Sequence, residues 1–196
     1  MIFTVYFDVE TGGVEPKHPT ISLAAVAVDA DMREVGWFDQ RIKFDESACD
    51  PKALELNRYT REDWAQAVPP HVCTSRFAGF VKDFSSVQMI SKRTGRPYSV
   101  AQLAGYNALT FDLPRLRALF GTDFFPCSYQ VRDVLQRALF YFDERPDLSK
   151  PENFKLSTVA AYFGIDTAGA HDALTDVRLT VAVHRMLRAE QKAKVA

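Results

Sequence analysis

The sequence contains little cysteine, no excess of charge of either sign and no long apolar run. Its three cysteines, Cys49, Cys73 and Cys127, are widely spaced and form no CxxC pair, which argues against a disulfide framework or a zinc site. The 24 basic residues are balanced by 25 acidic ones, so the net charge carries no signature of a general polyanion binder. We therefore expect reduced thiols in a cytoplasmic protein, and any contact with a polyanion must be local.

Segments that could enter a membrane are also missing. The apolar run 2–7 has no basic segment before it and ends at Asp8, and the longest other stretch, 23–28, is too short to cross a bilayer. We expect neither secretion nor membrane insertion. Hydrophobic residues make up 47% of the 196 positions, which predicts one domain over residues 1–196, although two small domains would also fit this length.

The order of the predicted elements favours an α/β fold. The apolar run 2–7 predicts a first strand, and 20–29 with 34–44 predicts a hairpin joined by a polar turn. Asp50 and Pro51 are typical of a helix start, and Thr60 begins a second short helix that Pro69 and Pro70 stop. Further helices are predicted at 71–84, 111–120, 134–142, 156–163 and 172–189, strands at 101–106 and 129–131, and a basic loop at 91–97. Three strands followed by alternating helices and strands predict an α/β sandwich with a mixed sheet.

Two carboxylates follow the first predicted strand. Strand side chains repeat every two residues, so Asp8 and Glu10 point to the same face, with Cα atoms about 6.5 Å apart. Core strands rarely tolerate charge without a partner, and hard divalent ions such as Mg²⁺ or Mn²⁺ prefer oxygen ligands. The pair therefore predicts half of a metal site.

Three further polar residues lie where chemistry is expected. Asp176 shares a helical stripe with apolar neighbours, where an uncompensated charge is costly. His171 precedes the same helix, and a histidine can accept a proton at neutral pH. Asp112 follows a short core strand, and open α/β folds keep reactive groups at the carboxyl ends of their strands.

The motifs that contain these residues resemble, in chain order, the three exonuclease motifs of the DEDDh family. They read FDVETGG at 7–13, YNALTFDLPRL at 106–116 and HDALTD at 171–176. That family includes the proofreading epsilon subunit of bacterial DNA polymerase III, ribonuclease T and oligoribonuclease. The resemblance covers nearly the whole chain, and it implies a ribonuclease H-like fold with a five-stranded mixed sheet flanked by helices.

The resemblance also implies roles for individual residues. Two divalent ions, Mg²⁺ or Mn²⁺, would be held by the four acidic residues, with His171 as the base that deprotonates the attacking water. Two ions can stabilise both the attacking and the leaving oxygen of an in-line displacement. The implied catalytic residues are Asp8, Glu10, Asp112, His171 and Asp176, of which the four carboxylates are also the metal ligands, and the implied substrate-binding residues are Thr11, Gly12 and Asn107.

The chain departs from many relatives at two positions. A second Thr is common in the first motif where this chain has Gly12, and the added backbone freedom can change the fit of the terminal nucleotide. A His is common before the Asn of the second motif, where this chain has Tyr106. Neither departure implies a loss of activity.

Each candidate also has a purely structural interpretation. The first acidic pair can form a strand-end turn or ion pairs, and Asp112 can simply favour a helix start through the macrodipole. Asp176 can be partnered by Arg178 or Arg132, and His171 can cap the last helix. The joint occurrence of all five residues in family order favours catalysis over these interpretations.

Other polar residues outside the acidic set favour structural roles. His184 lies on an apolar helical face, which predicts a core histidine with a satisfied hydrogen bond. Asn107 serves equally well as a turn residue or as a residue that shapes the site. The basic loop at 91–97 is typical of a solvated surface, although such a loop can also follow a phosphate backbone.

The sequence therefore predicts a metal-dependent 3′-to-5′ exonuclease acting on single-stranded or frayed DNA and releasing nucleoside monophosphates. Three alternatives stay open: the same chemistry on RNA or short oligoribonucleotides, a ribonuclease H-like endonuclease, and a non-catalytic module that binds nucleic acid or a polymerase. The expected partner is single-stranded nucleic acid, with DNA favoured over RNA, and a polymerase or repair complex is left open.

Overall fold

The computed structural model describes residues 2–168 and 172–193. Its strands and helices follow one another in the order β1 (Thr4–Thr11), β2 (Thr20–Val28), β3 (Glu34–Arg41), η1 (Glu46–Ala48), α1 (Pro51–Leu56), α2 (Pro70–Lys82), β4 (Ser85–Ile90), β5 (Pro97–Ala101), β6 (Leu103–Gly105), α3 (Asp112–Phe120), β7 (Arg132–Asp133), α4 (Val134–Asp143), α5 (Leu156–Tyr162) and α6 (Ala173–Ala193). Among these helices none is both long and apolar enough to span a bilayer.

A mixed five-stranded sheet forms the centre of the fold, in the order β3-β2-β1-β6-β7. β1 pairs antiparallel with β2 and parallel with β6, and β7 continues the parallel side. The predicted hairpin of β2 and β3 and the mixed sheet are therefore confirmed. Because β6 ends at Gly105, the second half of β1 extends past the end of its parallel neighbour.

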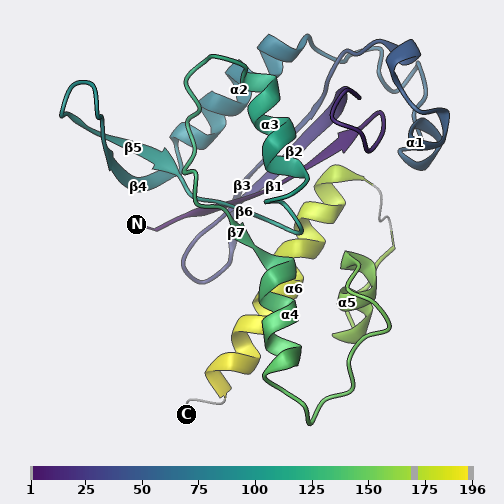
Figure 1. The fold of residues 1–196 in the computed structure, drawn as a ribbon, viewed down its shortest axis with the longest axis vertical. Coiled ribbons are helices and arrows are strands. Elements are labelled where there is room, and N and C mark those ends of the chain that lie inside the picture. Colours follow the sequence, from purple (N-terminus) through teal and green to yellow (C-terminus); the bar gives the residue numbers. More distant parts are fainter. Residues whose placement is uncertain (1, 169–171, 194–196) are drawn as a thin grey trace.

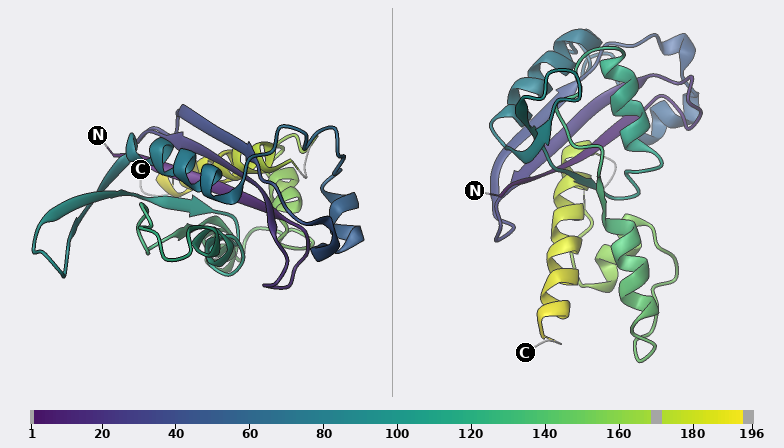
Figure 2. Two further views of the ribbon diagram at one scale, coloured as in Figure 1. Left: turned by 90° about the horizontal axis from the view of Figure 1, so that it is seen from above. Right: turned by 60° about the vertical axis from the view of Figure 1, so that its left-hand side comes forward.

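Helices cover both faces of this sheet (Figure 1). Alternate residues of β1 point to opposite faces, so Phe7 packs with α2 and α3, whereas Tyr6 packs with α4, α5 and α6. Figure 2 shows the same two layers from above. Asp8 and Glu10 share the face of Tyr6, which places them under α6.

Several predicted boundaries are confirmed for clear local reasons. Asp50 caps α1 by accepting a hydrogen bond from the amide of Lys52, and Pro51 is the first helical residue. Pro114 lies in the first turn of α3, where its missing N–H costs nothing. All three cysteines are free thiols, as their number and spacing predict.

The second short helix predicted from Thr60 is wrong. Residues 61–66 form turns, and Thr60 Oγ1 donates a hydrogen bond to Asp63 Oδ2 and accepts one from the backbone amide of Asp63. Such local bonds compete with a helical ladder. Pro70 also begins α2 instead of only ending the preceding segment.

The strands between α2 and α3 also differ from the prediction. β4 and β5 form a separate two-stranded arm that projects from the body, and the basic loop at 91–97 contains its turn (Figure 1). The predicted strand at 101–106 is divided at Gln102, and the strand predicted at 129–131 lies at Arg132–Asp133. The β4 segment has no strong apolar alternation, and its pairing with β5 stabilises it instead.

Candidate active site

Asp8 and Glu10 lie in the second half of β1, not after it. In the register with β2, Asp8 is opposite Ala24 and Glu10 is opposite Ser22, and both acidic side chains are partly exposed. The small partners on β2 leave space above the sheet on this face. The strand therefore presents two adjacent carboxylates towards α6.

Asp112 is the first residue of α3 and is buried. Its Oδ1 accepts a hydrogen bond from the amide of Val9 at 3.2 Å. This amide lies beyond the end of β6, where β1 has no parallel neighbour to pair with. Because β6 is short, the Val9 amide is available to bond with Asp112. The interpretation of Asp112 as only a helix-start residue is therefore insufficient.

Asp176 lies in the first turn of α6 on the stripe that the sequence predicts. Its stripe neighbours Ala173, Thr180, Val183 and Leu187 are all buried, so this face of α6 packs on the sheet. Arg178, one of the partners considered for Asp176, instead forms an ion pair with Glu34 at 2.9 Å.

The pKa values of the acidic residues show that their charges act on one another. Burial, followed by the charges of Asp112, Glu10 and Asp176, raises the pKa of Asp8 well above its usual range. Burial and the charge of Asp176 raise the pKa of Glu10 to about 7. Burial raises the pKa of Asp112 to about 7, although the hydrogen bond from Val9 opposes the rise. A cation would relieve this repulsion.

The chemistry of this donor set fits a hard divalent cation. The set consists of carboxylate oxygens, which Mg²⁺ and Mn²⁺ prefer. Within residues 2–168 and 172–193, however, no three His, Cys, Asp or Glu side chains already form a coordination group. The structure thus places Glu10, Asp112 and Asp176 close enough to Asp8 for their charges to raise its pKa.

The raised pKa values predict a pH dependence of stability in the metal-free protein. Glu10 and Asp112 have ordinary pKa values of 4.5 and 3.8 and folded values of about 7. Between these limits the folded state binds more protons than the unfolded state, so unfolding free energy falls as pH rises through this window. The unfolding free energy of Asp112→Asn should therefore increasingly exceed that of wild type as pH rises from 5 to 8.

Urea unfolding in EDTA of both proteins checks this expectation. The comparison is needed because His184, whose pKa is lowered to about 4 by burial, has the opposite effect below its ordinary value of 6.5. That contribution is common to both proteins and cancels in the difference. A difference that stays constant across the pH range would contradict the raised pKa of Asp112.

His171, the predicted general base, lies outside the described residues. Its role remains a prediction from the third motif. The adjacent Asp172 is described: its Oδ2 accepts a hydrogen bond from the amide of Thr175 at 3.1 Å, as a residue at the start of α6 would. Its charge also contributes to the raised pKa values of Asp8 and Glu10.

The loop after β1 is held by backbone hydrogen bonds. The amide of Gly12 donates to Pro19, and the carbonyl of Gly12 accepts from the amide of Asp50. Asn57 Nδ2 donates to the carbonyl of Thr11 at 3.0 Å. A Cβ at position 12 would collide with Cys49 Sγ, which gives a physical reason for the glycine in this chain.

Asn107 forms a turn. Its φ of 56° lies in the left-handed region, and its side-chain Oδ1 accepts a hydrogen bond from Thr110 Oγ1 at 2.8 Å. Its amide donates to Asp133 Oδ1 at 3.1 Å. The turn interpretation is therefore confirmed, and a contact of Asn107 with substrate stays a prediction.

A cavity of about 230 Å³ lies beside Glu10. Its lining includes Asp39, Asn57, Trp64 and Asp172, none of which belongs to the predicted site. Asn57 belongs to no sequence motif, and its contact with Thr11 arises only from the way α1 packs, so the sequence could not indicate it. Asp172 is part of the third motif, so its proximity to the site could have been inferred from that motif.

Together, the sheet order and the acidic end of β1 define a ribonuclease H-like α/β fold. The sequence itself matches no protein-family model and none of the curated proteins. The matching solved structures include several of exonuclease I.

Three of these structures illustrate the likeness. E. coli exonuclease I in complex with a dT13 oligonucleotide has a TM-score of 0.78 and 22% identity, over 100% of this chain and 43% of that chain. The zinc-bound form of the E. coli enzyme with single-stranded DNA has a TM-score of 0.75 and 23% identity, over 98% of this chain and 41% of that chain. Exonuclease I from Methylocaldum szegediense has a TM-score of 0.77 and 21% identity, over 98% of this chain and 41% of that chain. This chain thus spans less than half the length of these enzymes, and the likeness establishes the fold.

Proposed function

We propose that this chain is a metal-dependent 3′-to-5′ exonuclease that hydrolyses single-stranded or frayed DNA and releases nucleoside monophosphates. The observation that carries this proposal is a group of four acidic residues whose charges repel one another: two in the second half of β1, one in α3 and one in α6. The fold that holds them is similar to that of exonuclease I. The neighbouring structures with dT13 and dA16 oligonucleotides support DNA as the substrate class.

The cofactor in this proposal is a pair of Mg²⁺ or Mn²⁺ ions. The residues that would hold them are Asp8, Glu10, Asp112 and Asp176. When bound, such ions lower the pKa of a water molecule and neutralise charge on the scissile phosphate. Local neutralisation of this kind is consistent with the net charge of −1, since no broad basic surface is needed.

The chain's own residues divide the remaining tasks. His171 takes the proton from the attacking water, and its ordinary pKa suits that role near neutral pH. Thr11 and Gly12 seat the terminal nucleotide. Because the amide and carbonyl of Gly12 are engaged with Pro19 and Asp50, we expect this residue to position the nucleotide by packing.

The domain assignment is part of the same proposal. Residues 1–196 would form one exonuclease domain, which is consistent with the likeness covering 96–100% of the chain. One neighbour is a complex of exonuclease I with SSB-Ct, which supports a search for a partner protein of this chain.

A direct assay tests the activity and its polymer. End-labelled single-stranded DNA and RNA of equal sequence are incubated with the protein and Mg²⁺ or Mn²⁺, with EDTA as the control. We expect stepwise release of mononucleotides from the 3′ end of DNA, and none in EDTA. Faster release from RNA would assign the enzyme to the exoribonuclease alternative, internal cuts would indicate an endonuclease, and no release from either polymer would exclude catalysis.

A further inference from the structure

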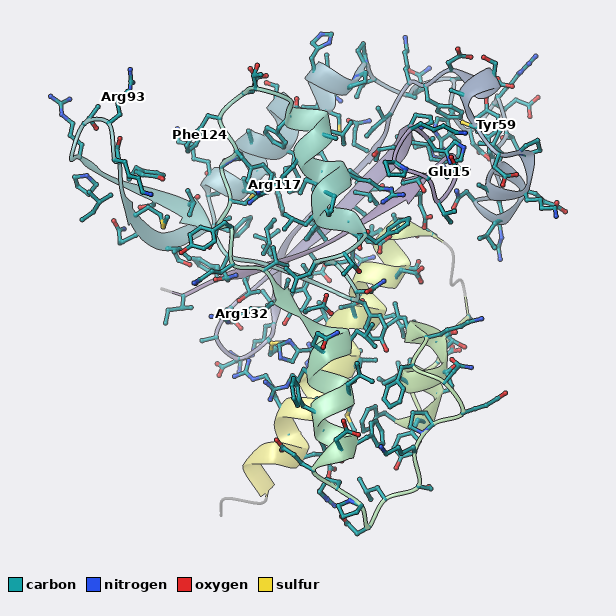
Figure 3. All side chains as sticks on the ribbon, in the orientation of Figure 1. Glu15, Tyr59, Arg93, Arg117, Phe124 and Arg132 are labelled. Carbon is teal, nitrogen blue, oxygen red and sulfur yellow. The ribbon has the colours of Figure 1, made fainter. Side chains whose placement is uncertain are left out.

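A second cavity lies towards the amino end of β1, away from the acidic cluster. Its volume is about 590 Å³, and its walls come from β1, the turn between β2 and β3, β7, α4 and α6. Arg132, one of its lining residues, lies beside the turn between β2 and β3 in Figure 3. Arg188, another lining residue, is twelve positions after Asp176 on α6, which corresponds to about 18 Å along the helix. The two sites are therefore separate.

The floor of this cavity is buried and uncharged at neutral pH. Tyr6 and His184 share a hydrogen bond there, so the prediction of a satisfied core histidine is confirmed. Burial, followed by the nearby charges of Arg137, Arg188 and Arg132, lowers the pKa of His184 to about 4. His184 thus stays neutral and contributes no charge of its own.

Among the residues that the structure describes, three guanidinium groups line the cavity: those of Arg132, Arg137 and Arg188. They come from β7, α4 and α6, and the charges of all three act on both Tyr6 and His184. The pKa of Arg137 is lowered by burial and then by the charge of Arg188. Like charges are therefore gathered around one space, an arrangement that an anion would stabilise.

The carboxylates in the lining are engaged with backbone amides. Asp133 accepts hydrogen bonds from the amides of Asn107, Leu109 and Leu135, as the N-cap of α4 and the support of the preceding turn. Asp29 Oδ1 accepts from two amides in the turn between β2 and β3. These carboxylates hold local structure. Among the described lining residues, three positive charges stand against two negative ones, which gives this part of the lining a positive balance.

We propose that this cavity binds a phosphate monoester, with Arg132, Arg137 and Arg188 as its oxyanion ligands. Guanidinium groups match phosphate oxygens in bidentate geometry, and a tetrahedral phosphate can be shared by groups arriving from three elements. A carboxylate offers only two oxygens, so an acidic peptide fits this arrangement less well. The volume lies in the range of small-molecule pockets, which makes a nucleoside monophosphate a suitable ligand.

Titration of dTMP into the full chain in EDTA tests this site. EDTA removes the metal ions that the proposed exonuclease requires, so binding is measured without turnover and the two proposals can fail separately. We expect saturable binding in wild type and at least about tenfold weaker binding in Arg132→Gln/Arg188→Gln. Arg93→Gln, at the tip of the β4–β5 arm, removes one charge far from the cavity and should bind dTMP as wild type does (Figure 3).

Two further ligands identify the recognised group. Thymidine should not bind, and inorganic phosphate should compete with dTMP. Equal affinity of phosphate and dTMP would assign the site to phosphate alone, whereas tighter binding of dTMP would add recognition of the nucleoside. The proposal is overturned if neither anion binds at millimolar concentration, if the folded double variant binds like wild type, or if an acidic peptide occupies the cavity and dTMP does not.

Discussion

Asp8→Asn is expected to lose at least about 10³-fold of the DNA hydrolysis rate. Metal ions contribute several kcal/mol of charge stabilisation to such reactions, and each factor of ten corresponds to about 1.4 kcal/mol. Asp8 is the acidic residue on which the charges of Glu10, Asp112 and Asp176 all act. Removing its charge should therefore weaken the proposed metal site more than any other single replacement in the set.

A second readout separates lost chemistry from lost folding. Because the pKa of Asp8 is raised in the folded state, its ionised form destabilises that state when no cation is bound. Asp8→Asn should consequently be more stable than wild type in EDTA at pH 8, and calorimetry should detect weaker Mn²⁺ binding. A variant that is inactive and unfolded would not support the proposed role.

The matched control is Asp39→Asn. Asp39 pairs with Ala24, which in turn pairs with Asp8, so the two acidic residues lie in one row across the sheet, two strands apart. The same substitution on β3 removes a charge close to the site but outside the proposed ligand set. It should lose less than about tenfold of the rate. Equal losses in both variants would indicate a general electrostatic effect instead of metal coordination.

The sequence predicts the acidic residues but not the contacts that gather them. Alternation along β1 correctly places Asp8 and Glu10 on one face. The hydrogen bond between Asp112 and Val9, however, depends on β6 ending at Gly105, a tertiary fact with no local signal. Motif order supplied what local patterns could not, because three spaced motifs together constrain the fold.

The errors in the predicted elements have a similar origin. The turns at 61–66 look helical by composition, but the bond between Thr60 and Asp63 closes them locally. The β4–β5 arm escapes prediction because neither strand has a strong pattern without its partner. The arginine-lined cavity is likewise invisible in the sequence, since Arg132 and Arg188 are brought together only by the packing of β7 and α6 around Tyr6.

His171→Ala is expected to lose between about 10² and 10⁴ of the turnover rate while still binding Mn²⁺ and single-stranded DNA. The prediction follows from the third motif, which places a histidine ahead of Asp176 and gives it the role of base. At saturating Mn²⁺ the acidic ligands are ionised, so a fall of the wild-type rate below about pH 6.5 would report protonation of His171. That acid limb should disappear in the variant.

His71→Ala is the matched control, because His71 is exposed in the first turn of α2 on the opposite layer of the fold. It should retain the wild-type rate and the wild-type pH profile. Single-turnover rates across pH 5.5 to 8.5 for the three proteins, together with Mn²⁺ and DNA affinities, make the comparison complete. If His171→Ala turned over near the wild-type rate, or kept the acid limb, the base would have to be another group. The proposed site would then consist of the four carboxylates without His171.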